Sequence, residues 1–323
     1  MKKVIESRSF RQCLSVLVLS TVCALFVRTI SAKPAATAVE GRWNITVDVA
    51  GAPASSWLEV IHSGNHTLVG RYVSVSGSAR PISEVHFEDG KFNFSIPPQW
   101  EKGAGNFSFE GTVEGDKMSG SLTMPDGKTH QWTGVRAPTL RRDKRPVWGE
   151  PVKLIKPTEG STIEGWHTVG TSQWTIQNGI LKSEKSGVNL ITDDKYQDFK
   201  LHAEFRIPKG SNSGVYLRGR YEVQVSDGKG LEPSPYELGG VYGFISPSEM
   251  MAKYPGEWQS FDVTLIGRMI TLVVNGKEVI TNQEIPGTTG RALDSREAEP
   301  GPLYVQGDHG PVEYRNIVVT PGK

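Results

Sequence analysis

Four side chains that could move a proton or hold a polar ligand occur within the short stretch 218–227. They are Arg218, Glu222, Gln224 and Asp227. Carboxylates can act as general bases or nucleophiles, an arginine stabilises negative charge, and a glutamine orients a ligand by hydrogen bonding. Such a set can act on one ligand only where its members reach a common surface. The stretch is therefore a candidate site whose geometry depends on the local backbone.

Strand periodicity would provide that surface. Successive residues of a strand point to opposite faces, so the tyrosine and valines of 221–225 form an apolar side while Glu222 and Gln224 project from the other. The preceding run, 212–218, alternates in the same way and places Arg218 on its polar side. A tight glycine turn separates the two runs. We therefore predict two adjacent strands that present Arg218, Glu222 and Gln224 on a shared face.

The whole chain favours β-structure. Its 323 residues, 37% hydrophobic and 22% charged, are ordinary for a soluble globular protein and sufficient for two domains. Short alternating runs separated by Gly, Asn and Asp turns follow one another along the sequence, which predicts an all-β fold. We expect a small antiparallel β-barrel at 40–137, similar to a calycin, and a Pro- and Arg-rich linker at 138–150. A two-sheet β-sandwich of the jelly-roll type should follow at 151–323, with one concave face open.

The first 32 residues have the order of a secretory signal peptide. Basic residues precede an apolar run from Cys13 to Val27, and Ile30-Ser31-Ala32 can serve as a small-residue cleavage site. An uncleaved membrane anchor is one alternative, although the run is shorter than the roughly 20 residues that span a bilayer. A lipoprotein is another, although Val22 stands where a small residue should precede a lipidated Cys23. We expect a periplasmic or extracellular protein whose mature form has no membrane span.

Cleavage at this point would change the thiol content and the charge of the protein. Both cysteines, Cys13 and Cys23, lie inside the segment, so the mature chain would have neither a thiol nor a disulfide. The net charge would change from +1 to about −3. Without a basic stripe, the mature protein is not expected to bind nucleic acid.

Several sequence blocks follow one another between residues 148 and 321. They are Ala203-Glu204-Phe205-Arg206-Ile207, Asn212-Ser213-Gly214-Val215-Tyr216-Leu217-Arg218-Gly219, Tyr221-Glu222-Val223-Gln224-Val225-Ser226-Asp227, Gly256-Glu257-Trp258, Val274-Asn275-Gly276, and Gly301-Pro302-Leu303 through Arg315-Asn316-Ile317. In type and order these blocks resemble the 3-keto-disaccharide hydrolase domain family, which has a concanavalin-like glucanase fold. One block departs from the family pattern Gln-x-His-Gly, because 306–310 has one additional residue between Gln306 and His309. The N-terminal barrel lies outside the resemblance.

The resemblance implies an enzyme whose substrate is a carbohydrate, a 3-keto-glycoside. The ketone acidifies the hydrogen on C2, so a base can remove it, form an enolate and expel the group on C1, after which water addition completes hydrolysis. In this interpretation Glu222 is the base, His309 the acid or second base, and Arg218 the oxyanion stabiliser. Gln224 would orient the substrate, and Asp227 would tune the site or bind a metal. The residues expected to contact sugar are Glu204, Tyr242, Trp258 and Gln306.

Structural roles are the alternatives for several of these residues. Glu204, Arg206 and Arg218 could form a cross-strand ion-pair ladder on a solvated face. The run 212–214 could be only a turn. Trp258 could belong to the core, and the barrel tryptophans could pack in the barrel core instead of lining a ligand site. Those tryptophans are Trp57, Trp100 and Trp132.

Two further function classes stay open. The spacing Glu222-x-Gln224-x-x-Asp227 resembles the Glu-x-Asp-x-x-Glu strand of family-16 glucanases, and a β-bulge would return Asp227 to the Glu222 face. However, a retaining glycosidase uses two carboxylates about 5 to 5.5 Å apart, and Gln224 cannot ionise. A lectin-like module without turnover is the other class, since jelly rolls host both functions. No His-x-His spacing indicates a metal, but a calcium ion held by backbone and carboxylate oxygens is compatible with the sequence.

Overall fold

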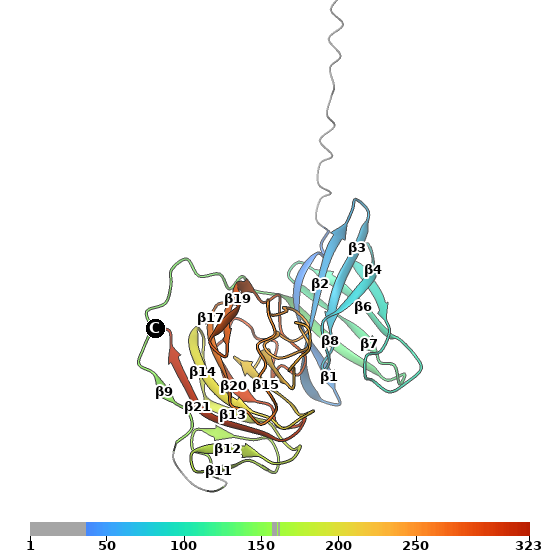
Figure 1. The fold of residues 1–323 in the computed structure, drawn as a ribbon. Coiled ribbons are helices and arrows are strands. Elements are labelled where there is room, and N and C mark those ends of the chain that lie inside the picture. The colour runs from blue at the N-terminus through green and yellow to red at the C-terminus, as the bar shows by residue number, and fades with distance from the viewer. Residues whose placement is uncertain (1–36, 157–159, 161) are drawn as a thin grey trace, which may run out of the picture. The chain divides into compact units, whose positions relative to one another are not determined.

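The structure is a computed structural model that describes residues 37–156, 160 and 162–323. The predicted signal peptide, 1–32, lies outside the described residues. All the regular secondary-structure elements in the described part of the chain are β-strands (Figure 1). The predicted all-β class is therefore confirmed. Within the same ranges, no helix has the length and apolar character needed to cross a membrane.

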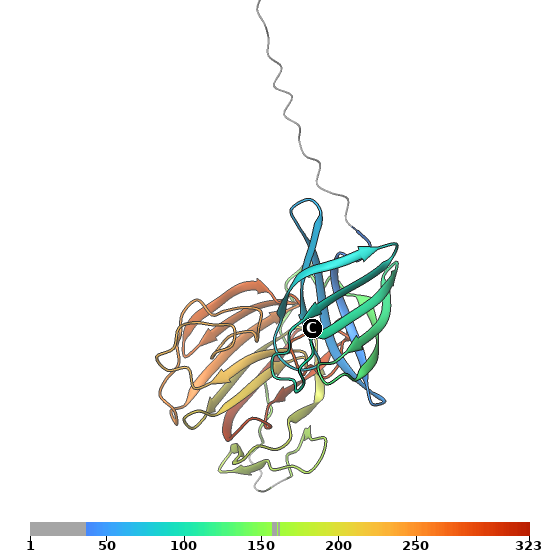
Figure 2. The same cartoon turned by 90° about the vertical axis from the view of Figure 1, so that its right-hand side faces the viewer.

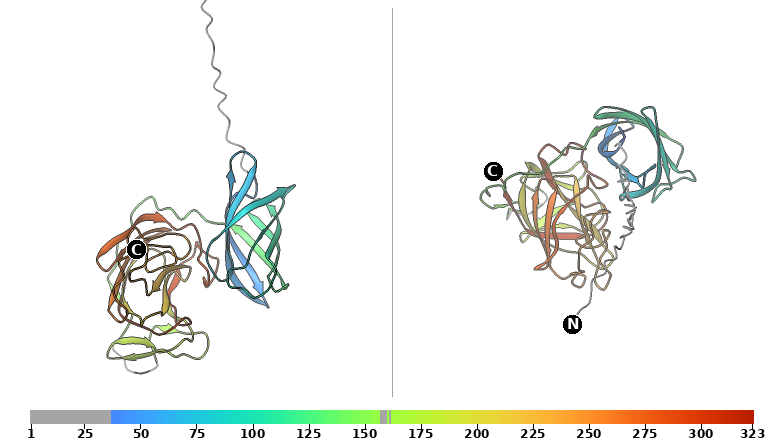
Figure 3. Two further views of the ribbon diagram at one scale, coloured as in Figure 1. Left: turned by 45° about the vertical axis from the view of Figure 1, so that its right-hand side comes forward. Right: turned by 90° about the horizontal axis from the view of Figure 1, so that it is seen from above.

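The first eight strands close into an antiparallel barrel. They pair in sequence order, and β1 completes the ring by pairing with both β2 and β8 (Figure 3, right panel). The barrel core is apolar and contains stacked rings such as Phe109 and Trp132, whose centroids lie 4.4 Å apart. Trp132 is thus a core residue. The barrel strands are β1 (Gly41–Val49), β2 (Ala52–Ser63), β3 (Thr67–Val73), β4 (Arg80–Glu88), β5 (Lys91–Ile96), β6 (Phe107–Glu114), β7 (Lys117–Thr123) and β8 (Thr129–Arg136).

The remaining strands form two antiparallel sheets (Figure 2). The five-stranded sheet contains, in order, β10 (Trp166–His167), β13 (Leu190–Tyr196), β20 (Gly301–Val305), β15 (Asn212–Leu217) and β16 (Tyr221–Ser226). The eight-stranded sheet contains β11 (Thr175–Gln177), β12 (Ile180–Ser183), β21 (Val312–Pro321), β14 (Phe199–Arg206), β17 (Gln259–Ile266), β18 (Met269–Val274) and β19 (Lys277–Glu284), with β9 (Val152–Lys153) paired to β21.

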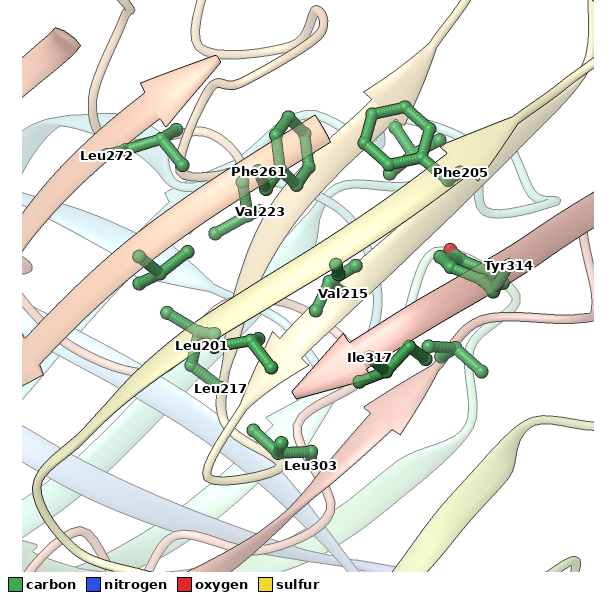
Figure 4. Close-up of a cluster of buried hydrophobic side chains, with 14 of the residues drawn as sticks. Leu201, Phe205, Val215, Leu217, Val223, Phe261, Leu272, Leu303, Tyr314 and Ile317 are labelled. Atoms are coloured by element: carbon green, nitrogen blue, oxygen red, sulfur yellow. The ribbon is translucent and has the colours of Figure 1, made fainter. Parts of the chain in front are cut away.

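One hydrophobic core is shared by the two sheets (Figure 4). Leu201 and Phe205 of β14 and Phe261 of β17 belong to it together with Val215 of β15 and Val223 of β16. Burial of each such side chain contributes about 1.5–3 kcal/mol to folding. Because side chains alternate along β15 and β16, the residues between these apolar positions lie on the opposite face of the five-stranded sheet. That face carries the candidate site.

The barrel and the two sheets belong to one compact unit. Ser295, in the loop before β20, donates a hydrogen bond from Oγ to the Ile45 carbonyl of β1 at 2.5 Å. Trp57 of β2 is fully buried and packs edge-on against Phe244, with ring centroids 5.1 Å apart. Trp57 therefore contacts the loop after β16 and does not belong to the cluster that fills the barrel. Within the predicted linker 138–150, Leu140 is buried as well.

Candidate active site

A cleft of about 590 Å³ opens on the polar face of the five-stranded sheet. Its lining combines residues of β15 and β16 with residues from loops. Five of the nine predicted site residues line the cleft, and they are Glu222, Gln224, Tyr242, Gln306 and His309. The structure thus brings together a carboxyl, an imidazole, two amides and a phenol around one cavity.

Glu222, on strand β16, contributes a carboxyl group to this cleft. It pairs directly opposite Tyr216 in the β15–β16 register, so the two side chains share a face. The Tyr216 hydroxyl donates a hydrogen bond to Glu222 Oε2 at 2.8 Å. Burial, which leaves Glu222 only 4% exposed, raises its pKa to about 7, while the bond from Tyr216 opposes the rise. A carboxyl with this pKa can accept and return a proton near neutral pH.

Gly214 makes room for the Glu222 carboxyl. A Cβ at position 214 would lie 2.5 Å from Glu222 Oε1, a distance that real Cβ contacts do not reach. The neighbouring Ser213 donates a hydrogen bond from Oγ to the Gln306 carbonyl at 2.6 Å and so holds the end of β20 beside β15. The run 212–214 is the start of strand β15, so the alternative that it forms only a turn is wrong.

His309 is paired with its neighbour Asp308, which lies within the block that is one residue longer than the family pattern. The distance between His309 Nδ1 and Asp308 Oδ1 is 2.6 Å, and Asp308 Oδ2 lies 3.3 Å from Arg291 Nη1. The hydrogen bond to Asp308 raises the pKa of His309, against the effect of burial, and the negative charges of Asp308 and Glu222 raise it further. This arrangement favours a protonated imidazole beside a carboxyl that can lose its proton near neutral pH.

Gln224 and Gln306 bring two amides to the same cleft. Both side chains are buried, and in each the Oε1 atom has no hydrogen-bond partner among the described residues. A buried polar atom without a partner costs about 1–3 kcal/mol. Hydroxyl groups of a bound ligand could provide the missing partners, as could a rotation of either amide. The two glutamines are therefore suited to accept hydrogen bonds from a polar ligand.

Arg218 does not lie on the Glu222 face. It follows the end of β15 with a φ of 53°, so strand alternation no longer determines the direction of its side chain. The guanidinium is fully buried, and Nη2 donates to the Tyr221 hydroxyl at 2.8 Å. Tyr221 belongs to the shared core and donates in turn to Glu297 at 2.7 Å. The predicted placement of Arg218 beside Glu222 is wrong, and Arg291 is the arginine that lines the cleft.

Asp227 also lies away from the cleft. β16 ends at Ser226 and pairs with β15 without a shift in register, so the β-bulge expected to turn Asp227 toward Glu222 is absent from this described pair. Asp227 Oδ2 instead accepts a hydrogen bond from the Gly210 amide at 3.2 Å. Across the described residues, no group of three or more His, Cys, Asp or Glu is arranged to hold a metal ion.

Glu204 and Trp258 lie together on the outer side of the eight-stranded sheet. Glu204 of β14 pairs across to Arg315 of β21, whose Nε lies 2.6 Å from Glu204 Oε2. The Arg315 guanidinium lies 4.0 Å from the centroid of the Trp258 ring, and Arg206 covers the same ring at 4.8 Å. Arg206 forms an ion pair with Glu313, which lies opposite it on β21. The cross-strand ion-pair alternative is therefore correct for Glu204 and Arg206 and wrong for the buried Arg218. Neither Glu204 nor Trp258 is placed to contact a sugar at Glu222.

Sequence reasoning missed several residues that line the cleft or hold its parts. Tyr216 could have been found from the strand register, since it lies opposite Glu222. The signal for Asp308 was the length of its block, 306–310, which is one residue longer than the family pattern. Arg291 lies in the long loop between β19 and β20, where no periodicity indicates a role. Trp100, for which packing in the barrel core was the alternative to lining a ligand site, is 62% exposed and lines this cleft, so the core role is wrong for it.

Comparison with known proteins gives a family match over the second half of the chain. Residues 153–320, just over half of the sequence, match the model of a family described as "3-keto-alpha-glucoside-1,2-lyase-like domain". A 3-keto-disaccharide hydrolase of Bacteroides thetaiotaomicron is 34% identical over 91 residues, which covers 23% of this chain and 31% of that protein. The match thus spans about a third of the length of this curated relative.

Two solved structures illustrate the structural likeness. A protein from Parabacteroides distasonis, described only as a candidate glycosyl hydrolase, aligns with a TM-score of 0.43 and 25% identity over 52% of this chain and 82% of its own. The family GH16 endo-beta-1,3(4)-glucanase SCLam aligns with a TM-score of 0.36 and 8% identity over 58% of this chain and 95% of its own.

Proposed function

The chain belongs to the family of 3-keto-alpha-glucoside-1,2-lyase-like domains, and we propose that it cleaves 3-keto-glycosides by removing the C2 proton and eliminating the group on C1. The observation that carries the proposal is the environment of Glu222. Its buried carboxyl, with a pKa of about 7, shares a cleft with His309, whose pKa is raised by the bond to Asp308. A base that is about half ionised at neutral pH and an acid that keeps its proton suit an elimination.

The reaction would proceed with these groups in the following order. Glu222 takes the proton from C2, and the electron pair moves toward the ketone, which leaves negative charge on its oxygen. As the enolate collapses, the C1–O bond breaks and His309 gives a proton to the departing oxygen. The product is an unsaturated ketone with a double bond between C1 and C2. Addition of water, with hydroxyl at C1 and the Glu222 proton at C2, returns His309 to its protonated form and completes hydrolysis.

The remaining cleft residues would bind and stabilise the sugar. Arg291 takes the role predicted for Arg218, because a cation near the developing enolate lowers its energy. Its guanidinium is half exposed and paired with Asp308, so it can reorient toward a ligand. Gln224, Gln306 and Tyr242 would bind the sugar hydroxyls. These roles require no contribution from the outer face of the eight-stranded sheet.

An ordinary glycoside hydrolase is the second candidate, and one observation favours it. Burial raises the pKa of Glu222, whereas hydrogen bonding and charge from His309 and Arg291 lower the pKa of Asp308 despite its burial. Two carboxyls whose pKa values are pushed apart are the usual acid and base of a glycosidase. In that case Asp308, and not Gln224, would be the second carboxylate, and the ketone would not be needed.

A matched pair of substrates distinguishes the two candidates. Purified protein would be incubated with a 3-keto-glucoside and with its unoxidised parent, and release of the aglycone would be measured. We expect cleavage of the keto sugar alone, and a slower reaction when C2 carries deuterium and proton removal limits the rate. Equal cleavage of both sugars would refute the elimination and indicate an ordinary glycosidase. Binding of both without cleavage would indicate a lectin-like protein.

Glu222→Gln tests the base directly. The substitution keeps the shape of the side chain but removes its basicity, so turnover should fall at least about a hundredfold with substrate binding largely preserved. Asp227→Asn is the matched control, because Asp227 is a carboxylate outside the cleft and its loss should leave turnover close to that of the wild type. Near-normal turnover by Glu222→Gln would remove Glu222 from this role.

The proposal includes export and a specific architecture for the sheets. The basic, apolar and small-residue order of 1–32 supports cleavage after about Ala32 and a periplasmic or extracellular location. Mass spectrometry of the mature protein would check this, and an intact Met1 would contradict it.

The two antiparallel sheets around one core support a concanavalin-like jelly roll, whose concave face would carry the cleft.

A further inference from the structure

The barrel supplies part of the cleft that contains Glu222. Ser76 and Gly77, between β3 and β4, and Trp100, between β5 and β6, line the same cavity. All three precede residue 153, where the family match begins. We propose that they form a subsite for the leaving sugar of a disaccharide substrate, with Trp100 as its stacking platform. This inference rests on the proposed function, since it assigns the position of the group expelled from C1.

The aromatic residues around the cleft fit a sugar ring. Trp100 is 62% exposed, and Tyr236, which is 45% exposed, lines the same cavity. Tyr242 packs edge-on against Tyr236 with ring centroids 5.8 Å apart, which fixes the orientation of the two phenols. Aromatic faces provide large rigid apolar surface, and a pyranose presents C–H groups on its flat faces. Trp100 and Tyr236 therefore offer the kind of surface that a second sugar ring covers.

The loop that carries Trp100 is held in place before any ligand binds. The Glu101 carboxylate accepts hydrogen bonds from the backbone amides of Gln99 at 2.8 Å and Trp100 at 3.1 Å. Gln99 Oε1 in turn accepts from the Ser78 amide at 3.0 Å, which ties the loop to the segment that contains Gly77. A ligand that stacks on Trp100 would therefore lose little free energy to ordering of the loop.

Direct backbone contacts join the barrel segment to the loops of the catalytic cleft. The Arg291 amide donates a hydrogen bond to the Val75 carbonyl at 3.2 Å. A Cβ at Gly290 would lie 2.1 Å from the Gly77 carbonyl oxygen, and a Cβ at Gly243 would lie 2.8 Å from the Ala79 amide nitrogen. Because only glycine allows such close approach, the barrel segment is packed tightly against the loops that carry Arg291 and Tyr242.

The test compares two substrates that differ only in the leaving group. One is a 3-keto-α-glucosyl disaccharide and the other is methyl 3-keto-α-glucoside, whose aglycone is too small to reach Trp100. In the full-length protein, Trp100→Ala should raise KM for the disaccharide about 3- to 10-fold, the range of one aromatic stacking contact, and leave the methyl glycoside unaffected. Trp100→Phe should retain most of the disaccharide affinity. Tyr254→Ala, an equally exposed aromatic outside the cleft, is the control.

The outcomes separate this inference from the proposed function. Unchanged KM for the disaccharide in Trp100→Ala would overturn the subsite, and so would an equal rise for both substrates. If the wild type turned over neither sugar, the proposed elimination would be refuted. The subsite would then be tested by calorimetry, with the binding of an unoxidised disaccharide compared with that of methyl α-glucoside. Weaker disaccharide binding by Trp100→Ala, with monosaccharide binding unchanged, would support the subsite. Equal binding by all variants, or no disaccharide binding at all, would overturn it.

Discussion

Tyr216→Phe should move the pH dependence of catalysis. Burial raises the pKa of Glu222 to about 7 against the opposing effect of the Tyr216 hydroxyl, which donates to Oε2 at 2.8 Å. A hydrogen bond to a charged group contributes about 1.5–3 kcal/mol, which corresponds to about 1–2 pKa units. Phenylalanine keeps the ring but removes the donor, so the ionised carboxylate loses this stabilisation. The pKa of Glu222 in the variant should therefore lie at about 8–9.

The pH profile of kcat/KM shows whether this reasoning holds. At pH 7 the ionised fraction of Glu222 should fall from about one half to about 1–10%, so kcat/KM should fall about 5- to 50-fold. The acidic limb should shift upward by about 1–2 pH units, and a ¹³C titration of labelled glutamate would give the pKa independently. Tyr236→Phe is the control, because Tyr236 lines the cleft without a bond to Glu222. A loss that is equal at every pH, with the acidic limb unmoved, would refute the role of the hydrogen bond.

Three other substitutions test the placement of single residues. The pKa of Glu222 is raised from 4.5 to about 7 in the folded protein. The contribution of Glu222 to the free energy of unfolding is therefore fully present below about pH 4.5, where the carboxyl is protonated, and is lost as the pH rises through about 7. Glu222→Gln should thus gain up to about 3 kcal/mol in the free energy of unfolding over this window, and a gain independent of pH would contradict the assignment. Gly214→Ala should lower turnover at least about a hundredfold, with the β-sheet circular dichroism retained, because its Cβ would displace Glu222 Oε1. Arg218→Met should lower the free energy of unfolding by about 1–3 kcal/mol, because the buried acceptors Tyr221 and Gly267 lose their donor. Arg291→Met should instead lower kcat/KM and leave the melting temperature unchanged, and the reverse pattern would restore the catalytic role predicted for Arg218.

The sequence predicted the parts of the site that lie inside strands. Alternation along β16 places Glu222 and Gln224 on one face, and the structure has them there. The same rule gave the wrong direction for Arg218 because the chain leaves the strand at that residue and adopts a positive φ. The β-bulge expected to return Asp227 to the Glu222 face is absent, because the pairing of β15 with β16 ends regularly at Ser226. Periodicity is thus reliable up to the last paired residue and carries no information beyond it.

Residues contributed by loops were harder to predict for a different reason. Arg291 and Trp100 reach the cleft through contacts between segments far apart in the sequence, such as the Arg291 amide with the Val75 carbonyl. Neither turn chemistry nor hydrophobic spacing encodes such contacts. The eight barrel strands, by contrast, follow from local turn signals, and their closure into a barrel agrees with the prediction. The barrel could therefore be predicted as a fold, while the cleft that Trp100 shares with Glu222 could not.

Asp308, beside His309, affects the proposed acid of the cleft more than the proposed base, Glu222. Its negative charge raises the pKa of both Glu222 and His309, but the positive charge of Arg291 lowers both. Since Asp308 and Arg291 form an ion pair at 3.3 Å, their effects on Glu222 largely oppose each other. The direct hydrogen bond between Asp308 and His309 at 2.6 Å has no such counterpart. In the proposed mechanism, Asp308 therefore extends the pH range in which His309 can donate a proton and leaves the acidic limit, expected from Glu222, nearly in place.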